Sequence, residues 1–119
     1  MTDLAKKLRI VDGRRVRLIH APDRHALMLG EVELSSGTAE VVLLYSRNRA
    51  QLDRDVPAAI AAVQDGGVLW VCYPKRSAKT PSDLSRDVVR DGMAAHGRHP
   101  VSQVSIDDTW SALRFKPDP

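Results

Sequence analysis

The chain has 119 residues, of which 43% are hydrophobic and 28% charged, and its formal net charge is +3. This length predicts one domain over residues 1–119, and no apolar run approaches the roughly 18 residues that a membrane helix needs. No apolar block follows the N-terminal lysines and arginines, so no secretory signal is expected and the sequence predicts a cytoplasmic protein. The single cysteine, Cys72, excludes an internal disulfide.

The first third of the chain alternates short helices and strands. Thr2 or Asp3 can cap a helix that runs to about Arg9, and the turn signal Asp12-Gly13 follows it. The next predicted elements are a strand at 15–20, a helix at 23–29 that Gly30 ends, and a brief edge strand at 31–34.

The middle of the chain predicts a buried strand followed by a long helix. Residues 41–45 are all apolar, which is typical of a strand covered on both faces. The helix is expected from Asn48 or Arg49 to Gln64, with an apolar stripe formed by Leu52, Val56, Ile60 and Val63. Pro57 predicts a kink, or a fresh helix start capped by Asp55.

Gly66-Gly67 ends that helix and introduces a second continuous apolar run at 68–73, which predicts the central strand. A further helix is predicted from Pro81 to about His96, with Thr80 as its cap. Its charged residues Arg86, Asp87, Arg90 and Asp91 are expected on the solvent face. Residues 101–106 alternate in polarity and, with 110–115, predict an antiparallel hairpin.

Strands separated by helices, with buried central strands, predict an α/β fold. The expected architecture is a three-layer sandwich with a mostly parallel sheet and a C-terminal antiparallel hairpin.

Three segments carry a resemblance to known proteins: residues 69–75, 83–87 and 107–115. They resemble a family of short bacterial proteins of unknown function, and the order of elements resembles the second half of class I methyltransferase folds. The resemblance implies a reduced Rossmann-like fold and brings no known activity or catalytic residue.

The chain departs from the methyltransferase pattern where the cofactor would bind. The loop at 20–26 contains no glycine, although such a loop lets the backbone approach a cofactor closely. Glu33 is the only acidic candidate for holding ribose hydroxyls. S-adenosylmethionine is therefore not expected, and the absence of a GxGxxG motif argues against a nicotinamide dinucleotide. The sequence predicts no cofactor.

Ligands of open α/β sheets bind beyond the carboxyl ends of the strands, and basic residues gather in those loops. We call these basic residues, together with Tyr73 and Thr80, the basic rim. The helix start at Pro81 is expected to open toward the same edge of the sheet. The candidate ligand-binding residues are Arg24, Arg47, Arg49, Tyr73, Lys75, Arg76, Lys79 and Thr80. The rim predicts a site for a phosphate, carboxylate or phosphodiester; the alternative is an ordinary solvated loop surface.

Other reactive residue types have simpler interpretations. His20 and His25 are candidates for acid–base or metal chemistry, but His96 and His99 lie at the other end of the sheet and no metal site is expected. Asp107 and Asp108 are interpreted as turn formers. Cys72, Trp70 and Trp110 are interpreted as packing residues.

These observations favour a non-catalytic binding or regulatory module that recognises an anionic ligand or partner through the basic rim, with a homodimer left open. One alternative is a small transferase-like enzyme with a degenerate cofactor loop, in which Tyr73, Lys75 or His20 would act. The other is a nucleic-acid-binding protein, although the 4% aromatic content argues against recognition of single strands by stacking.

Overall fold

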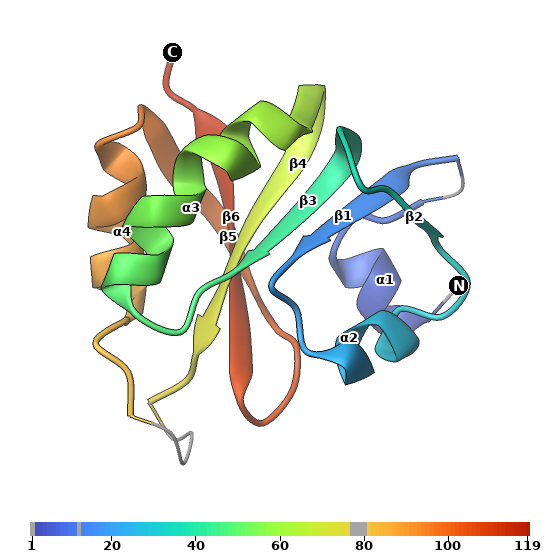
Figure 1. Ribbon diagram of the computed structural model, residues 1–119, viewed down its shortest axis with the longest axis horizontal. Helices are drawn as coiled ribbons and strands as arrows, with labels where there is room; N and C mark the ends of the chain where they lie inside the picture. Colours follow the sequence, from blue (N-terminus) through green and yellow to red (C-terminus); the bar gives the residue numbers. More distant parts are fainter. Residues whose placement is uncertain (1, 12, 77–80) are drawn as a thin grey trace.

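The computed structural model describes residues 2–11, 13–76 and 81–119. A six-stranded sheet forms its centre, and helices lie against both faces of the sheet (Figure 1). No helix within the described residues is both long and apolar enough to cross a membrane.

The N-terminal elements follow the predicted order. They are α1 (Asp3–Lys7), β1 (Arg15–Ile19), α2 (Asp23–Met28) and β2 (Glu33–Leu34). The Thr2 side chain caps α1 by accepting a hydrogen bond from the backbone N–H of Ala5. His20 follows β1 with φ +59°, a left-handed conformation that is uncommon for a residue other than glycine.

The remaining elements carry most of the core. They are β3 (Ala39–Tyr45), α3 (Arg49–Ala62), β4 (Val63–Pro74), α4 (Arg86–Ala94), β5 (Arg98–Ser105) and β6 (Trp110–Pro117).

The strand order is β2-β1-β3-β4-β6-β5. The first four strands in this order are parallel, whereas β6 runs antiparallel to both of its neighbours. This arrangement confirms the predicted fold class. The chain passes from β1 outward to β2 and then returns to β3, so a topological switch point lies between β1 and β3. Open α/β sheets bind ligands at such points.

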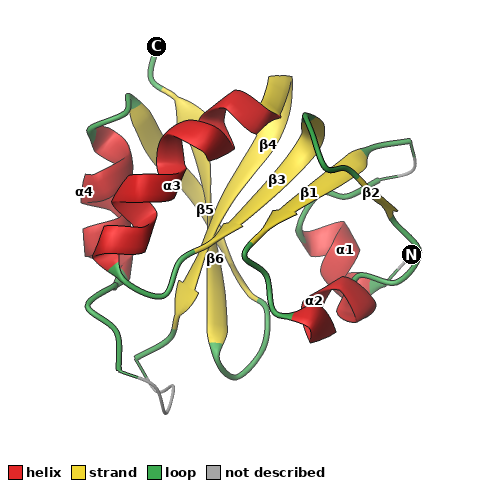
Figure 2. Cartoon of the chain, in the orientation of Figure 1, coloured by secondary structure: helices red, strands yellow, loops and turns green. Residues whose placement is uncertain are grey.

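Residues 41–45 of β3 and 68–73 of β4 are apolar at every position because both faces of the sheet are covered there. Val42 and Leu44 pack with residues of α3 and α4, which lie together on one side of the sheet (Figure 2). Val41 and Leu43 pack with residues of α1 on the other side. Cys72 lies fully buried in this second layer, as predicted.

The predicted helix start at Pro81 is wrong, because α4 begins at Arg86. Residues before α4 contact the beginning of α3 instead. Ser82 donates from its hydroxyl to the carbonyl of Arg47 (2.6 Å), and Asp83 accepts from the backbone N–H of Arg49 (2.8 Å). The cap of α4 is Ser85, which accepts from the N–H of Val88. The predicted cap, Thr80, lies outside the described residues.

The structure also corrects the prediction of a fresh helix start at Pro57. The helix α3 runs through Pro57 without a break, and Asp55 binds Arg54 and His20 instead of capping a helix. The strand β4 begins at Val63, before the glycine pair, and the register with β3 shifts between Ala39 and Val41. A Cβ on Gly67 would lie 2.6 Å from the carbonyl oxygen of Glu40, so the irregular pairing requires glycine there.

Candidate functional site

Three hollows lie near the carboxyl ends of the parallel strands. The β1–β3 crevice has a volume of about 300 Å³ and is lined by His20, Ala21, Tyr45, Arg47, Gln51 and Arg54. The Trp110 hollow, of about 250 Å³, is lined by Pro22, Arg24, Arg47, Pro74, Thr109 and Trp110. The Tyr73 cleft, of about 560 Å³, is lined by Tyr73, Pro74, Lys75, Arg76, Ser85, Arg86, Gln103, Ser105 and Ser111.

The residues of the predicted basic rim are distributed among these hollows. Arg24 and Arg47 line the Trp110 hollow, whereas Tyr73, Lys75 and Arg76 line the Tyr73 cleft. The side chain of Arg49 is held by Asp53 and lines none of the three. Lys79 and Thr80 lie outside the described residues. The expected single rim is therefore divided, and the helix start, which lies at Arg86 and not at Pro81, lines the Tyr73 cleft.

The cations on the β1–β3 side already have partners. Arg24 pairs with Asp107 (3.1 Å), Arg49 with Asp53 (2.9 Å) and Arg54 with Asp55 (2.9 Å). The guanidinium of Arg47 lies 5.2 Å from the centre of the Trp110 ring, as a cation–π contact. Local carboxylates therefore neutralise most of the positive charge on this side.

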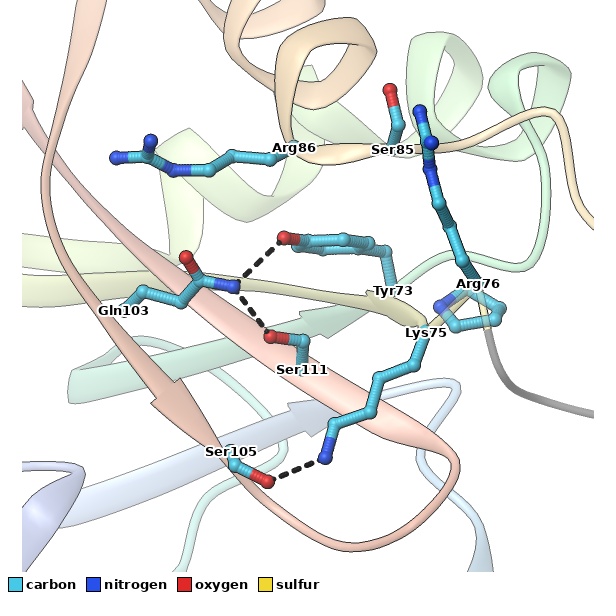
Figure 3. A pocket seen from close by; sticks show the side chains of 9 residues that line it. Tyr73, Lys75, Arg76, Ser85, Arg86, Gln103, Ser105 and Ser111 are labelled. Carbon is cyan, nitrogen blue, oxygen red and sulfur yellow. Dashed lines mark hydrogen bonds between the residues drawn. The ribbon is translucent and has the colours of Figure 1, made fainter.

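The cations of the Tyr73 cleft differ in this respect. Lys75 donates from Nζ to the neutral hydroxyl of Ser105 (2.6 Å). Among the described residues, no carboxylate oxygen lies within ion-pair distance of Lys75, Arg76 or Arg86. The three side chains extend from the end of β4 and the start of α4 around Tyr73 (Figure 3). Each of them lines the cleft without a carboxylate partner among the described residues, although their charged ends point in different directions in Figure 3.

Neutral polar groups form the floor of the Tyr73 cleft. Gln103 donates from its side-chain amide to the hydroxyl oxygens of Tyr73 (3.3 Å) and Ser111 (2.9 Å), as Figure 3 shows. Burial raises the pKa of the Tyr73 hydroxyl, so this group stays protonated at neutral pH. The cleft thus combines positive charge with hydroxyl groups.

Arg86, Gln103 and Ser111 were not among the candidates from the sequence. Arg86 is exposed, as expected from the sequence, but its place at the start of α4 also puts it at the Tyr73 cleft. Arg90, from the same predicted set, is exposed too and pairs with Asp87 and Asp91. Gln103 and Ser111 reach the cleft only because β6 pairs with β4, which places Ser111 opposite Tyr73.

A buried hydrogen-bonded chain lies behind the Trp110 hollow. His25, only 1% exposed, contacts the hydroxyl of Tyr45 through Nδ1 (2.7 Å) and the carboxylate of Asp107 through Nε2 (2.8 Å). Because an ionised carboxylate can only accept, Nε2 of His25 carries a proton and donates to Asp107. The rings of His25, Tyr45 and Trp110 pack together, with centroids 5.1 to 6.2 Å apart.

Asp107 joins this chain to the β5–β6 turn. Its other oxygen accepts from the backbone N–H groups of Thr109 (2.8 Å) and Trp110 (2.7 Å), the turn-forming role expected from the sequence. Burial opposes ionisation of Asp107, but hydrogen bonds from His25, the two backbone N–H groups and Arg24 outweigh it and lower its pKa to about 2.

We expect the contribution of Asp107 to stability to depend on pH. The pKa of the Asp107 carboxyl is lower in the folded chain than its usual value of 3.8. The ionised carboxylate therefore stabilises the folded state fully above pH 3.8, and this stabilisation is lost as the pH falls through about 2. Asp107→Asn should lower the free energy of unfolding by about 2 kcal/mol at pH 7 and by progressively less below pH 4. Urea denaturation at several pH values measures this difference.

Asp108→Asn is the matched control, because Asp108 makes none of the contacts that hold Asp107. A difference in the free energy of unfolding between Asp107→Asn and the unaltered chain that stays constant from pH 7 to pH 2 would contradict the lowered pKa of Asp107.

No protein-family model matches the chain, and no curated protein matches it. Solved structures do. The ribosomal protein L11 methylase of Lactobacillus delbrueckii subsp. bulgaricus superposes with a TM-score of 0.60 at 9% identity, over 98% of this chain and 78% of the methylase. The fold is methyltransferase-like. At this identity the likeness establishes the fold alone.

Two further structures agree. The DhpI–SAH complex gives a TM-score of 0.57 at 12% identity, over 98% of this chain and 83% of DhpI. The N-methyltransferase NodS of Bradyrhizobium japonicum gives 0.51 at 10% identity, over 99% of this chain and 82% of NodS. The reduced Rossmann-like fold implied by the sequence resemblance is therefore confirmed.

A methyltransferase fold implies S-adenosylmethionine, but the residues at the β1–β3 crevice do not fit it. His20 occupies the left-handed turn after β1, where it places a side chain that contacts Asp55 (3.3 Å). Glu33 pairs with Arg15 at the start of β1, at the opposite end of that strand from the crevice. Arg47 lines the crevice, Arg54 beside it is neutralised by Asp55, and no carboxylate is among the lining residues in the described parts of the chain, so nothing in the lining attracts a sulfonium cation.

Proposed function

We propose that this chain is a binding module that takes an anionic ligand in the Tyr73 cleft. The observation that supports the proposal is that Lys75, Arg76 and Arg86 line one cleft without a carboxylate partner among the described residues. Of the basic rim predicted from the sequence, the proposal keeps the residues that line the Tyr73 cleft, which are Tyr73, Lys75 and Arg76.

Some cations outside the Tyr73 cleft are offset by carboxylates, and others, such as Arg14 and Arg17, donate to backbone carbonyls. Elsewhere on its surface Arg15, Arg24, Arg54 and Arg90 each contact a carboxylate. A cleft lined by one sign of charge concentrates ions of the opposite sign, and its low-dielectric walls strengthen the attraction. The half-buried Lys75 is anchored by a neutral hydroxyl, so it keeps its full charge for a ligand.

Isothermal titration calorimetry with inorganic phosphate tests the proposal. We expect binding by the unaltered chain, and a loss of affinity of at least about tenfold in Lys75→Gln/Arg86→Gln, because charge-assisted hydrogen bonds are the strong ones. Arg90→Gln removes one positive charge from α4 outside the cleft and should leave the affinity unchanged.

Absence of phosphate binding, or equal loss in the Arg90→Gln control, would contradict the proposal. In the second case the binding would reflect general surface charge, which high salt should screen to the same extent in all variants.

A small transferase-like enzyme is the second candidate, and the likeness to methyltransferase structures favours it. Titration with S-adenosylhomocysteine separates the two. We expect no heat of binding. Binding of S-adenosylhomocysteine that is changed by His20→Ala and unchanged by Lys75→Gln would instead support a transferase site in the β1–β3 crevice.

A further inference from the structure

We propose that the ligand of the Tyr73 cleft is a phosphate monoester dianion whose organic part extends over Pro74 to the Arg47–Trp110 stack. This inference rests on the proposed function and names the ligand class for the same site. Two independent features of the cleft and its surroundings carry it.

The first feature is an excess of donors over acceptors. Lys75, Arg76 and Arg86 can only donate hydrogen bonds. The hydroxyl oxygen of Ser85 already accepts a hydrogen bond from the N–H of Val88. The amide nitrogen of Gln103 donates to the hydroxyl oxygens of Tyr73 and Ser111. A ligand that satisfies this lining must be rich in acceptors. A phosphate monoester presents three strong acceptor oxygens and up to two negative charges, whereas a carboxylate presents two oxygens and one charge.

The second feature is a neighbouring hollow whose own charges are satisfied. Pro74 lines both the Tyr73 cleft and the Trp110 hollow, so the two spaces share a wall. In the Trp110 hollow Arg24 is neutralised by Asp107, and the Arg47 guanidinium lies over the Trp110 ring. A guanidinium plane held in this way offers a flat surface for stacking a planar group. The hollow therefore suits an uncharged planar ring.

The charge of the cleft itself does not change near neutral pH. Its ionisable lining residues are Tyr73, Lys75, Arg76 and Arg86, and burial raises the pKa of Tyr73 further above neutrality. Neither a histidine nor a carboxylate lines the cleft in the described parts of the chain. His25 packs against Trp110 behind the neighbouring hollow, so the ligand is reported by a pH dependence between pH 5 and pH 7.5 that the phosphate ester shows and the sulfate ester lacks, because the second pKa of the phosphate ester is about 6.

The experiment compares 1-naphthyl phosphate, 1-naphthyl sulfate and inorganic phosphate by calorimetry with the full chain. At pH 7.5 we expect 1-naphthyl phosphate to bind about tenfold more tightly than the sulfate, a difference of about 1.4 kcal/mol. At pH 5 the phosphate ester carries a single charge, and the difference should largely disappear.

Arg47→Ala tests the second half of the inference. We expect the substitution to weaken the binding of 1-naphthyl phosphate by about threefold, because an exposed stacking contact is lost. The affinity for inorganic phosphate should not change. Arg47 holds the neighbouring segment through its backbone N–H and carbonyl, which the substitution retains. Arg90→Gln again serves as the control.

The outcomes separate this inference from the proposed function. Equal binding of the phosphate and sulfate esters at pH 7.5 would overturn the monoester assignment, and no effect of Arg47→Ala would overturn the placement of the organic part; either result leaves an anion site. Absence of binding by all three probes would overturn both.

Discussion

Replacing Trp70 by alanine should lower the free energy of unfolding by about 4 kcal/mol, the largest effect of any substitution considered for this chain. Trp70 lies in the middle of the central strand β4 and is 1% exposed. Its indole N–H donates to the carbonyl of Leu8 (3.0 Å), which fastens the end of α1 to the sheet. The substitution would leave a large cavity and an unpaired carbonyl together.

Chemical denaturation followed by circular dichroism measures the loss. Trp70→Phe is the informative control, because it keeps most of the buried ring and removes only the indole N–H. We expect it to cost about 1 to 2 kcal/mol. Loss of less than about 1 kcal/mol in Trp70→Ala would mean that the α1 layer does not pack on β4 as described.

The second large effect concerns His25, and His25→Ala should lower the free energy of unfolding by about 3 kcal/mol. The imidazole links Tyr45 to Asp107, and its loss leaves the buried hydroxyl of Tyr45 without this partner and removes one donor to the carboxylate. Asp107 still accepts from Arg24 and from two backbone N–H groups, which limits the loss.

His20→Ala is the matched control, because the side chain of His20 is 59% exposed and its ion pair among the described residues is with Asp55. We expect that substitution to change stability by less than about 0.5 kcal/mol. Similar small values for both histidine variants would show that the buried chain contributes little to folding.

Predictions that rest on local pattern agree with the structure. The continuous apolar runs at 41–45 and 68–73 are the buried central strands, because covering both faces of a sheet demands apolar residues at every position. The alternation at 101–106 reflects a half-exposed edge strand. These signals lie within a few residues of the element that they specify.

Features set by contacts between distant residues were missed. The helix start was misplaced because Asp83 binds Arg49, 34 residues away, instead of capping its own helix. The basic rim was overestimated because Arg24 meets Asp107, 83 positions away in sequence. His25 lies buried for the same reason, since the acid that pairs with it lies 82 positions away in the β5–β6 turn. No local pattern reports which carboxylate neutralises which cation.

The most direct test of an anion site in the Tyr73 cleft is a titration of the ¹⁵N-labelled chain with inorganic phosphate, followed by backbone amide NMR shifts. The account predicts saturable shifts at Lys75, Arg76, Arg86 and Gln103, with little change at Lys6 and Lys7 of α1, which lies on the other face of the sheet. Shifts spread evenly over the basic surface, or confined to the β1–β3 crevice, would contradict it.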